Sequence, residues 1–501
     1  MPTRTGIFWN VQKDMTFFDV LLRDKQTVIF AMDNIYDSVF TGIYNVTITA
    51  LYYDDEDIEP LTPADLILPI STKSSAKNLP SMFSIPDDHA AVSMSFPRNV
   101  ERAVVSILAS GNGAEEFWYT NVPTEYVNTF NNGAIYGYSP WREAQLLIDG
   151  ELAGVNWPFL TVFTGGISPG LWVPVVGIDT YDLPSFEIDI SPWIGVMCDG
   201  KDHTFEINVV GYDSKTTLGT VGSNWWVTGA VFLWLDDAGN QTLGSAPVSL
   251  SPPLVFDFKS HITTSSGVNT SLGVELVAYR SLSHTAMITT SAGNRTLTWS
   301  QSLSYQNIQQ ITNRGYNESL SQITSGTSSF SSTTRGSKSA PHQKPFTHTG
   351  QSQSLIISSY EYAIDLYQAN LVSADPQRTN NTLVAVLDRS FITTSVPILS
   401  YLTSPSSFPS YEALATRQNG SCIYYWNNTY YEFAGAIDPA VGTIGETEQW
   451  YSYSGPRPLG TGMTLRYGRH VVARDGYEPV LVEDEEYTHT IEVPRTHQIF
   501  G

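Results

Sequence analysis

The chain has 501 residues, of which 41% are hydrophobic, 12% aromatic and only 15% charged, and it carries a net charge of −23. This acidic balance argues against a protein that binds nucleic acid or an anionic membrane surface, because such binding needs a patch of basic residues. The length fits two or three domains rather than one, and low charge with many Ser, Thr, Tyr, Gly and Asn residues indicates β-rich globular structure rather than disorder.

The first 53 residues are predicted to contain strands. The clearest covers residues 41–52, where small or apolar residues alternate with polar ones, and a short apolar run lies at residues 28–32. The N-terminus has no apolar core of a signal peptide, and no stretch of the sequence reaches the roughly 18 apolar residues of a membrane span.

A buried strand is predicted over residues 96–109, followed by a turn at residues 111–113 that leads to Glu115 and Glu116. If residues 115–121 continue as a strand, alternate side chains point to opposite faces. Glu116, Trp118 and Thr120 then share one face. One of the two glutamates faces the interior of the sheet and the other faces solvent.

Further strands are predicted at residues 144–148, 186–190, 203–210 and 224–236. Asp149-Gly150 is a hairpin signal, and the last strand places Trp226 and Trp234 on the same face. Strands separated by Gly, Asp and Pro corners, with almost no helical periodicity, predict an all-β, mostly antiparallel fold made of jelly-roll or β-sandwich domains.

The amino-acid composition changes after about residue 250, where Ser and Thr become frequent. We therefore predict a β-sandwich domain at residues 1–245 and a second β-rich domain at residues 246–501. Strands of the second domain are expected at residues 272–279, 354–362, 462–467 and 487–493. The Ser/Thr-rich stretch at residues 325–343 is predicted to be a surface loop or processing site.

The two cysteines, Cys198 and Cys422, lie in different halves of the chain, and the sequence leaves open whether they form a disulfide or remain two buried thiols. No metal-ligand spacing and no cofactor motif appears. Eight Asn-x-Ser/Thr sequons fit a secreted glycoprotein. They begin at Asn45, Asn240, Asn269, Asn294, Asn317, Asn380, Asn419 and Asn427.

Carboxylates, indole rings and turn-forming glycines are dense between Glu115 and Trp193. A polar cleft walled by rings suits a sugar, whereas the plain alternative is that the rings are core and the Gly and Pro residues are loop corners. Paired carboxylates are the only catalytic set that the sequence offers. Glu115 and Glu116 are adjacent and point apart. The candidate partners for one of them are Glu143, Asp179, Asp182 and Asp189.

Several strings resemble the plant and fungal peptide N-glycanase A family in order and spacing over about residues 3–240. They include TGIFW at residues 5–9, FPRN at 96–99, EFWYTN at 116–121, RE at 142–143 and TGGISP at 164–169. The resemblance is looser beyond residue 250.

The resemblance implies amidase chemistry on an N-glycopeptide or glycoprotein substrate. Members of the family cleave the bond between the innermost N-acetylglucosamine and the asparagine side chain, which leaves an Asp-peptide and a 1-amino glycan. The resemblance also implies an acid-tolerant, glycosylated protein that is secreted or vacuolar and needs no metal or cofactor. Some precursors of the family are cut into two chains that stay associated.

On this resemblance we expect Glu116 to be the main catalytic carboxylate, with Glu143 or Asp189 as its partner. Five side chains are given roles at the substrate. Trp118 and Trp172 would stack on the chitobiose core, Arg142 would orient a carboxylate or sugar oxygen, Asn121 would bond the N-acetyl group, and Thr164 would also bind substrate. The alternative is that Glu116 and Arg142 form a structural salt bridge and that the tryptophans are core.

The family normally begins with a signal peptide and a β segment that carries a GRQFDR-like word. We expect this chain to lack that segment, so that its first domain is N-terminally incomplete. The alternatives to an active amidase are a non-enzymatic glycan-binding or cell-surface sandwich, an inactive truncated homologue, and an O-glycosidase that uses two carboxylates.

Overall fold

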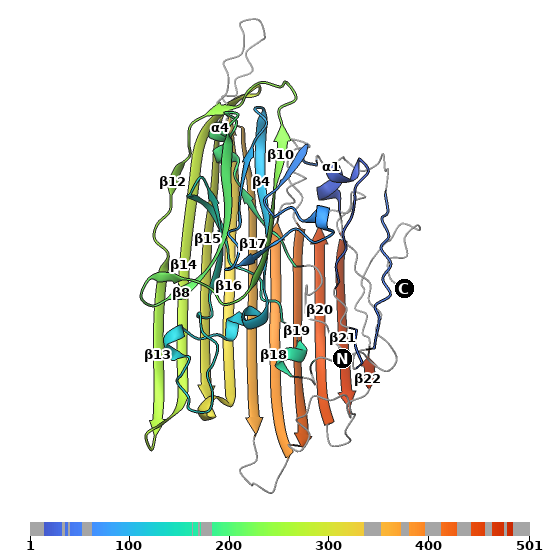
Figure 1. Cartoon of the computed structure of the whole chain (residues 1–501), viewed down its shortest axis with the longest axis vertical. Helices are drawn as coiled ribbons and strands as arrows, with labels where there is room; N and C mark the ends of the chain where they lie inside the picture. Colours follow the sequence, from blue (N-terminus) through green and yellow to red (C-terminus); the bar gives the residue numbers. More distant parts are fainter. Residues whose placement is uncertain are drawn as a thin grey trace, which may run out of the picture.

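The structure, a computed structural model, describes residues 15–32, 36–38, 41–52, 63–162, 164–168, 171, 183–334, 352–371, 380–395, 412–427, 442–455, 463–474 and 478–483. These residues form three antiparallel β-sheets joined by short helical turns (Figure 1). The all-β, mostly antiparallel sandwich expected from the sequence is thus confirmed. No helix in these ranges is long and apolar enough to cross a bilayer.

Two five-stranded sheets make a sandwich. The first runs in the order β1-β10-β4-β7 with β2 beside β10, and the second in the order β3-β8-β5-β6 with β9 beside β8. The strands of the first sheet are β1 (Leu66–Pro69), β2 (Phe83–Ile85), β4 (Val100–Gly111), β7 (Phe186–Asp189) and β10 (Trp225–Leu235). Those of the second are β3 (Ala91–Ser95), β5 (Arg142–Ile148), β6 (Glu151–Asn156), β8 (Asp202–Asp213) and β9 (Thr217–Gly219).

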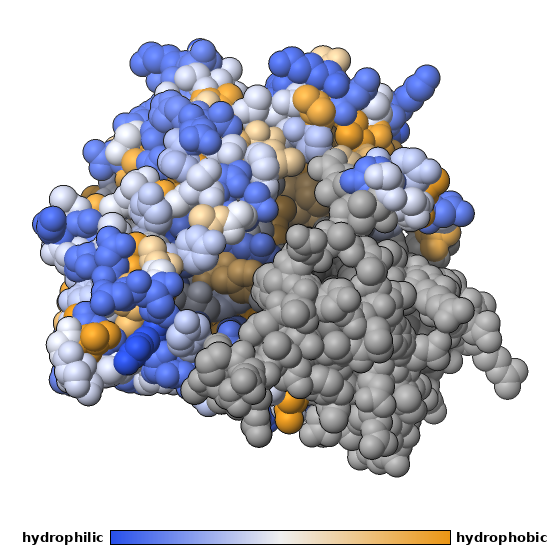
Figure 2. Space-filling model, turned by 60° about the horizontal axis from the view of Figure 1, so that its bottom comes forward, coloured by the Kyte–Doolittle hydropathy of each residue, from blue (hydrophilic) through white to orange (hydrophobic). Residues whose placement is uncertain are grey.

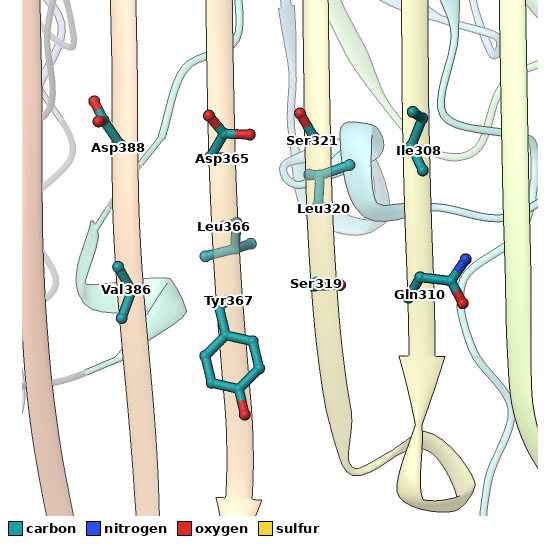
Figure 3. A pocket seen from close by; sticks show the side chains of 10 residues that line it. All are labelled: Ile308, Gln310, Ser319, Leu320, Ser321, Asp365, Leu366, Tyr367, Val386 and Asp388. Carbon is teal, nitrogen blue, oxygen red and sulfur yellow. The ribbon is translucent and has the colours of Figure 1, made fainter.

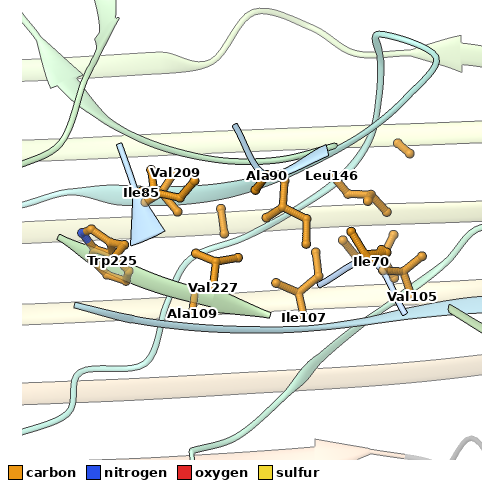
Figure 4. Packing of buried hydrophobic residues seen from close by; sticks show 14 of the residues in the cluster. Ile70, Ile85, Ala90, Val105, Ile107, Ala109, Leu146, Val209, Trp225 and Val227 are labelled. Atoms are coloured by element: carbon orange, nitrogen blue, oxygen red, sulfur yellow. The ribbon is translucent and has the colours of Figure 1, made fainter. Parts of the chain in front are cut away.

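The two sheets meet through alternate apolar side chains. Along β8 every second residue from Phe205 is buried, and these side chains face those of β4 and β10 in one core, part of which is seen in Figure 4. The approach is close at Gly229, where a Cβ atom would lie 2.8 Å from Ile207 Cδ1. The hydrophobic alternation read from the sequence is therefore what assembles the sandwich.

The predicted hairpin at Asp149-Gly150 is confirmed. These two residues separate β5 from β6 and have φ of 50° and 83°, the left-handed values that a two-residue hairpin loop with the twist of its strands requires. Trp226 and Trp234 fall on the same face of β10, because its pairing with β4 keeps register between them. Trp234 is buried there, whereas Trp226 is exposed.

The third sheet has 12 strands. From β14 onward each strand pairs antiparallel with the next one along the chain. These strands form the row of long ribbons side by side in Figure 1. Its strands are β11 (Leu243–Gly244), β12 (Val248–Leu250), β13 (Val255–Ser265), β14 (Val268–Thr290), β15 (Gly293–Thr312), β16 (Asn317–Thr334), β17 (Ser352–Leu371), β18 (Asn380–Ser395), β19 (Glu412–Asn427), β20 (Gly442–Gly455), β21 (Met463–Arg474) and β22 (Glu478–Glu483).

One face of this third sheet packs on the sandwich. Leu320, Leu366 and Leu387 from three neighbouring strands belong to the same core as Ile107 and Phe205 of the sandwich. The opposite face is open and carries Ile323 and Tyr367 among its exposed side chains. The predicted boundary between residues 245 and 246 stays a prediction.

The helical elements are one turn each. They are η1 (Thr16–Phe18), α1 (Asp19–Leu22), η2 (Ser75–Lys77), η3 (Gly113–Glu115), η4 (Trp118–Thr120), η5 (Thr124–Tyr126), α2 (Thr164–Ile167), η6 (Ser191–Trp193), α4 (Ile194–Met197) and η7 (Asn313–Gly315).

Two strand predictions near the N-terminus are wrong. Residues 28–32 and 41–52 are not in strands, and residues 41–52 are exposed throughout. Alternation permits a strand, but a strand also needs a hydrogen-bonding neighbour. None of the described strands pairs with either segment.

The predictions for the second region fare better. Residues 272–279 lie in β14 and residues 354–362 in β17, while β21 begins at Met463. The loop predicted at residues 325–343 is wrong for residues 325–334, which continue β16. The rest of that loop, and the strand predicted at residues 487–493, lie outside the described residues.

The cysteines do not form a disulfide. Both are free and buried, and the Cys422 thiol donates a 3.0 Å hydrogen bond to Ser168 Oγ. Of the alternatives that the sequence left open, the structure shows two separate thiols.

Candidate active site

Residues 113–120 fold into two helical turns, η3 and η4, rather than a strand. The turn depends on Gly111, because a Cβ atom there would lie 2.2 Å from the backbone oxygen of Glu115. The prediction that Glu116, Trp118 and Thr120 share the face of a strand is therefore wrong. The prediction that one glutamate points inward and the other outward holds in this different geometry.

Glu115 is the inward glutamate and is fully buried. Its Oε2 accepts hydrogen bonds from Arg142 Nε at 2.6 Å and Trp225 Nε1 at 2.7 Å, and its Oε1 accepts from Arg142 Nη2 at 2.9 Å and from the backbone of Gly222 at 2.8 Å. These four charge-assisted hydrogen bonds fix the position of the carboxylate. The structural salt bridge considered for Glu116 is formed by Glu115 instead.

Arg142 is as deeply placed as its partner, with 1% of its surface exposed. Its Nη1 donates to the backbone oxygens of Tyr138, Ser139 and Trp141 at 2.7 to 2.8 Å. The guanidinium is thus occupied by protein groups. Its predicted contact with a sugar stays a prediction, and the geometry does not favour it.

Glu143 lies in the interior on β5. Its carboxylate accepts from Trp157 Nε1 at 3.0 Å and Gln145 Nε2 at 2.7 Å, and it lies 3.7 Å from Arg280 Nε. Burial raises the pKa of the Glu143 carboxyl, although Arg280 opposes the shift. No water could reach this carboxyl without rearrangement of its partners.

Asp189, at the end of β7, is held in a second interior pair. Its Oδ2 lies 3.1 Å from Arg102 Nε and its Oδ1 accepts from the backbone of Ser191 at 3.0 Å. Burial raises the pKa of Asp189, while Arg102 and the Ser191 hydrogen bonds lower it. The structure does not bring Glu143, Asp189 and Glu116 together as hydrogen-bonded partners.

Trp118 packs inside the molecule. Its ring lies 6.1 Å from that of Trp225, and Arg142 sits over it at 5.9 Å. The alternative reading of this tryptophan as core is therefore the one that the packing favours. Trp172 and the side chain of Thr164 lie outside the described residues, so their predicted contacts with substrate stay predictions.

Asn121 presents an unusual environment. It is 1% exposed, and neither its side-chain oxygen nor its side-chain nitrogen has a hydrogen-bond partner in the described structure. Buried amides are nearly always satisfied, so an unsatisfied one needs a reason, such as a ligand or an ordered water. The predicted role of Asn121 in binding an N-acetyl group stays a prediction.

Glu116 differs from the other predicted carboxylates because it is only half-buried. Within the described residues its carboxylate takes part in no hydrogen bond or ion pair, and partial burial raises its pKa. A half-desolvated carboxylate without a partner is available for proton transfer. Of the three predicted catalytic groups, Glu116 alone has this property.

Two further titratable groups, Tyr119 and Glu318, were missed by sequence reasoning. Tyr119 is fully buried, its hydroxyl has no partner, and burial raises its pKa well above the ordinary range. Arg389 opposes that shift, whereas the charges of Glu318 and Glu116 add to it. Glu318 lies about 200 residues further along the chain, and burial raises its pKa to about 7. No motif marks it in the sequence.

The third sheet holds the segment that carries these groups. Gln309 Nε2 donates to the backbone oxygens of Tyr119 and Asn121 at 3.2 and 3.0 Å, and Asn307 Nδ2 donates to Tyr119 O at 3.0 Å. Because β15 donates side-chain hydrogen bonds to the turn after η4, the site is built from both halves of the chain.

Two open hollows lie away from these residues. One, of about 350 Å³, lies on the open face of the third sheet, where Ser319 and Ser321 lie between Tyr367 of β17 and Gln310 of β15 (Figure 3). On the next strand, Asp388 pairs with Arg417. The other, of about 540 Å³, lies beside Pro86 and Leu218. In Figure 2 the described surface is mostly hydrophilic, with hydrophobic residues gathered in a recess near the middle of the view. Neither hollow contains a predicted site residue.

No group of three or more His, Cys, Asp or Glu side chains in the described ranges is arranged to hold a metal ion.

Two family models match the chain. Residues 1–250 match "Peptide N-acetyl-beta-D-glucosaminyl asparaginase amidase A", and residues 273–362 match the "PNGase_A C-terminal domain". The chain belongs to the peptide N-glycanase A family. Both the η3–η4 segment and Glu318 lie inside the matched regions of that family.

A relative from Prunus dulcis, "Peptide-N4-(N-acetyl-beta-glucosaminyl)asparagine amidase A", is 35% identical over 326 residues. The alignment covers 61% of this chain and 54% of the relative, so the chain spans about half the length of that protein. Among solved structures, "Recombinant peptide: N-glycanase F (PNGase F)" matches at 14% identity with a TM-score of 0.21, over 35% of this chain and 54% of the other. At that score the likeness says nothing about how the two molecules are built.

Proposed function

We propose that this member of the family is an amidase of the peptide N-glycanase type. It hydrolyses the amide between N-acetylglucosamine and asparagine in an N-glycopeptide and yields an Asp-peptide and a 1-amino glycan. The name of the Prunus dulcis relative supports this reaction. The observation that carries the proposal is the half-buried, unpaired carboxylate of Glu116 on a turn that the rest of the fold holds rigidly.

Glu116 serves as the base that activates water. Its raised pKa makes it a better proton acceptor than an exposed glutamate, while above that pKa it remains ionised. The water oxygen adds to the side-chain carbonyl carbon of asparagine, and the carbon–nitrogen bond then breaks. Buried Glu115 and Arg142 give the turn its position beneath Glu116.

A jelly-roll topology is proposed for the sandwich. Without the short β2 and β9, its eight strands numbered in chain order follow 1-8-3-6 in one sheet and 2-7-4-5 in the other. Such an order places strands from the two ends of the domain side by side, as a pair of interlocked Greek keys does.

A secreted or vacuolar location is also proposed. It is supported by the eight sequons, of which Asn45, Asn240 and Asn294 are exposed. Processing into two associated chains remains part of the same proposal. Mass spectrometry of the protein purified from its native source, before and after enzymatic removal of glycans, would test both.

The reaction is tested by incubating the protein with a high-mannose glycopeptide and weighing the peptide product. Conversion of Asn to Asp shows amidase chemistry, and Glu116→Gln should abolish it. Retention of one N-acetylglucosamine on the peptide would show an O-glycosidase-like cut, and an unchanged glycopeptide that stays bound would favour a glycan-binding protein. Glu151→Gln, an exposed glutamate at the start of β6, is the matched control and should leave the rate unchanged.

A further inference from the structure

The backbone that follows Glu116 ends a helical turn inside the protein. In η4 the N–H of Asn121 donates to Trp118 O at 3.1 Å, which is the last hydrogen bond of the turn. The carbonyl oxygens of Tyr119 and Asn121 come after that acceptor, and the end of a helical turn leaves such carbonyls without a partner in the turn itself. Both residues are at most 1% exposed. Buried carbonyls need donors, so other parts of the chain must supply them.

Two side-chain amides of β15 supply these donors. Gln309 Nε2 lies 3.2 Å from Tyr119 O and 3.0 Å from Asn121 O, and Asn307 Nδ2 lies 3.0 Å from Tyr119 O. Side chains two residues apart on a strand share a face, which here is the face that covers the sandwich. Two neighbouring amides of the third sheet therefore cap a turn that is 188 to 190 positions away in the sequence.

The two amides are themselves held within the third sheet. Gln309 Nε2 also donates to Asn307 Oδ1 at 3.0 Å, and Asn307 Nδ2 donates to Gln322 Oε1 of β16 at 2.8 Å. The Tyr305 hydroxyl donates to the same Gln322 oxygen at 2.9 Å, and all four side chains are at most 2% exposed. A reversed Gln309 amide would place its oxygen against three oxygen acceptors, so only the observed orientation fits. These linked hydrogen bonds limit the rotation of each amide.

Apolar side chains of the same sheet pack on the residue that follows the turn. Val122 lies in a hydrophobic cluster with Leu272 and Val274 of β14 and with Ile311 of β15. Ile311 is two residues beyond Gln309 and shares its face of the strand. Polar and apolar contacts from the third sheet thus meet on one short segment of the sandwich.

Glu116 lies between two anchored points of the chain. Before it, the Glu115 carboxylate is bound within the sandwich by Arg142, Trp225 and the backbone of Gly222. After it, the carbonyls capped by β15 tie the chain to the third sheet. A single helical turn has little stability of its own, because its few hydrogen bonds do not offset the loss of backbone entropy. The position of Glu116 therefore depends on both anchors.

We propose that Gln309, assisted by Asn307, is a positioning residue that holds Glu116 in its catalytic position. This rests on the amidase function proposed above. Neither amide acts on the substrate, and Gln309 acts only through the turn that it caps. The third sheet is then part of the active site, and the two halves of the chain are needed together for the reaction and not for stability alone.

The size of the effect follows from the geometry of proton transfer. A general base must lie within hydrogen-bond reach of the proton that it takes. Displacement of a reacting group by about 1 Å can lower a rate about 100-fold. Without the Gln309 donors, the carbonyls of Tyr119 and Asn121 would be buried without their partners unless the turn moved toward water. A displacement of the adjoining Glu116 is the expected result.

The test compares the whole wild-type chain with Gln309→Met, Gln309→Asn and Gln310→Met. Methionine is as long as glutamine but has no N–H to donate, whereas asparagine keeps the amide and draws it back by one carbon. Gln310 is exposed on the opposite face of β15 and is the matched control.

Two properties of each variant are measured. The conversion of Asn to Asp in a high-mannose glycopeptide gives kcat and KM, and near-UV circular dichroism gives the folded fraction. Hydrogen–deuterium exchange followed by mass spectrometry reports on the turn independently of activity. If Gln309→Met does not fold, Gln309→Asn carries the test.

In Gln309→Met, kcat per folded molecule should fall about 100-fold, and KM should change far less, because Gln309 acts on the turn and not on the substrate. The backbone amides of residues 113–126 should exchange faster than in wild type, whereas those of β4 and β10 should keep wild-type rates, since only the turn is released. Gln309→Asn should show smaller changes of the same kind, and Gln310→Met should match wild type.

A wild-type kcat in folded Gln309→Met overturns the role given to Gln309 and leaves the amidase proposal standing. A lowered kcat with unchanged exchange at residues 113–126 also overturns it, because the effect would not pass through the turn. Faster exchange throughout β4 and β10 overturns it as well, since it marks a general loss of stability. A folded wild-type chain that converts no glycopeptide at any pH overturns the amidase proposal and the catalytic role of Gln309 with it.

Discussion

Arg142 and Glu115 form a buried, bidentate ion pair with nitrogen–oxygen distances of 2.6 and 2.9 Å. Glu115→Gln would leave the guanidinium buried without its counter-charge. We expect the variant to lose about 3–5 kcal/mol of unfolding free energy, as measured for broken buried pairs. Denaturant unfolding monitored by tryptophan fluorescence measures this loss. Glu151→Gln should change the value by less than about 0.5 kcal/mol, and an equally small change in Glu115→Gln would contradict the structural role.

Gly111 permits the turn that follows β4. Gly111→Ala places a methyl group 2.2 Å from the backbone oxygen of Glu115, where only movement of the main chain relieves the clash. We expect a loss of about 1–3 kcal/mol in unfolding free energy together with loss of activity, because the same turn carries Glu116. Gly42→Ala is the control, since nothing lies within 4 Å of the added atom. Equal stability of the two variants would show that the turn tolerates a side chain.

Asn121 should display a conflict between stability and binding. Its amide is buried without partners, so Asn121→Ala removes an unsatisfied group and should leave the unfolding free energy unchanged or raise it by up to about 1 kcal/mol. The KM for the glycopeptide should rise if the amide bonds the substrate. Asn99→Ala breaks a 3.0 Å bond to Asp236 O and should instead cost about 0.5–1.5 kcal/mol without a change in KM. A destabilised Asn121→Ala with wild-type KM would refute the binding role.

His284 makes the fold sensitive to acid. It is buried on β14, and desolvation lowers its pKa from 6.5 to about 4. Between those values the unfolded chain binds the proton more readily, so stability is full above pH 6.5 and falls as pH drops toward 4. The expected loss is about 3 kcal/mol at 1.36 kcal/mol per pKa unit. Unfolding curves at pH 7 and pH 4 should differ less in His284→Gln than in wild type. His89→Gln, exposed, should behave as wild type.

Local patterns predicted the sandwich well. Alternation along residues 203–210 and the left-handed pair at Asp149-Gly150 are properties of short segments, and both appear where they were expected. The alternation of apolar and polar residues at 41–52 gave a wrong prediction, because the sequence of one segment does not show whether a neighbouring strand pairs with it. The turn predicted at residues 111–113 is present, but the helical turns that follow it were missed for a similar reason, since the close approach of Glu115 O to Gly111 is visible only in the folded chain.

The site was harder to predict than the fold. The string around Glu116 led to the candidate turn, whose catalytic role stays a prediction, whereas Glu143 and Asp189 lie in interior ion pairs. The contact between the two halves of the chain carried no local signal, because Gln309 donates hydrogen bonds to the backbone of residues nearly 200 positions away. A carboxyl acquires its pKa from burial and neighbours, which the residue type does not specify.

The ladder between β16 and β17 has a consequence for nicking of the backbone. It runs from Asn317 opposite Ala369 to Thr334 opposite Ser352. A cut of the chain between the two strands would therefore leave the two fragments joined by the backbone hydrogen bonds of this ladder. Glu116, Tyr119 and Glu318 all precede such a cut. A protein cleaved there would remain two associated polypeptides under native conditions, and Glu116 would lie on the first of them.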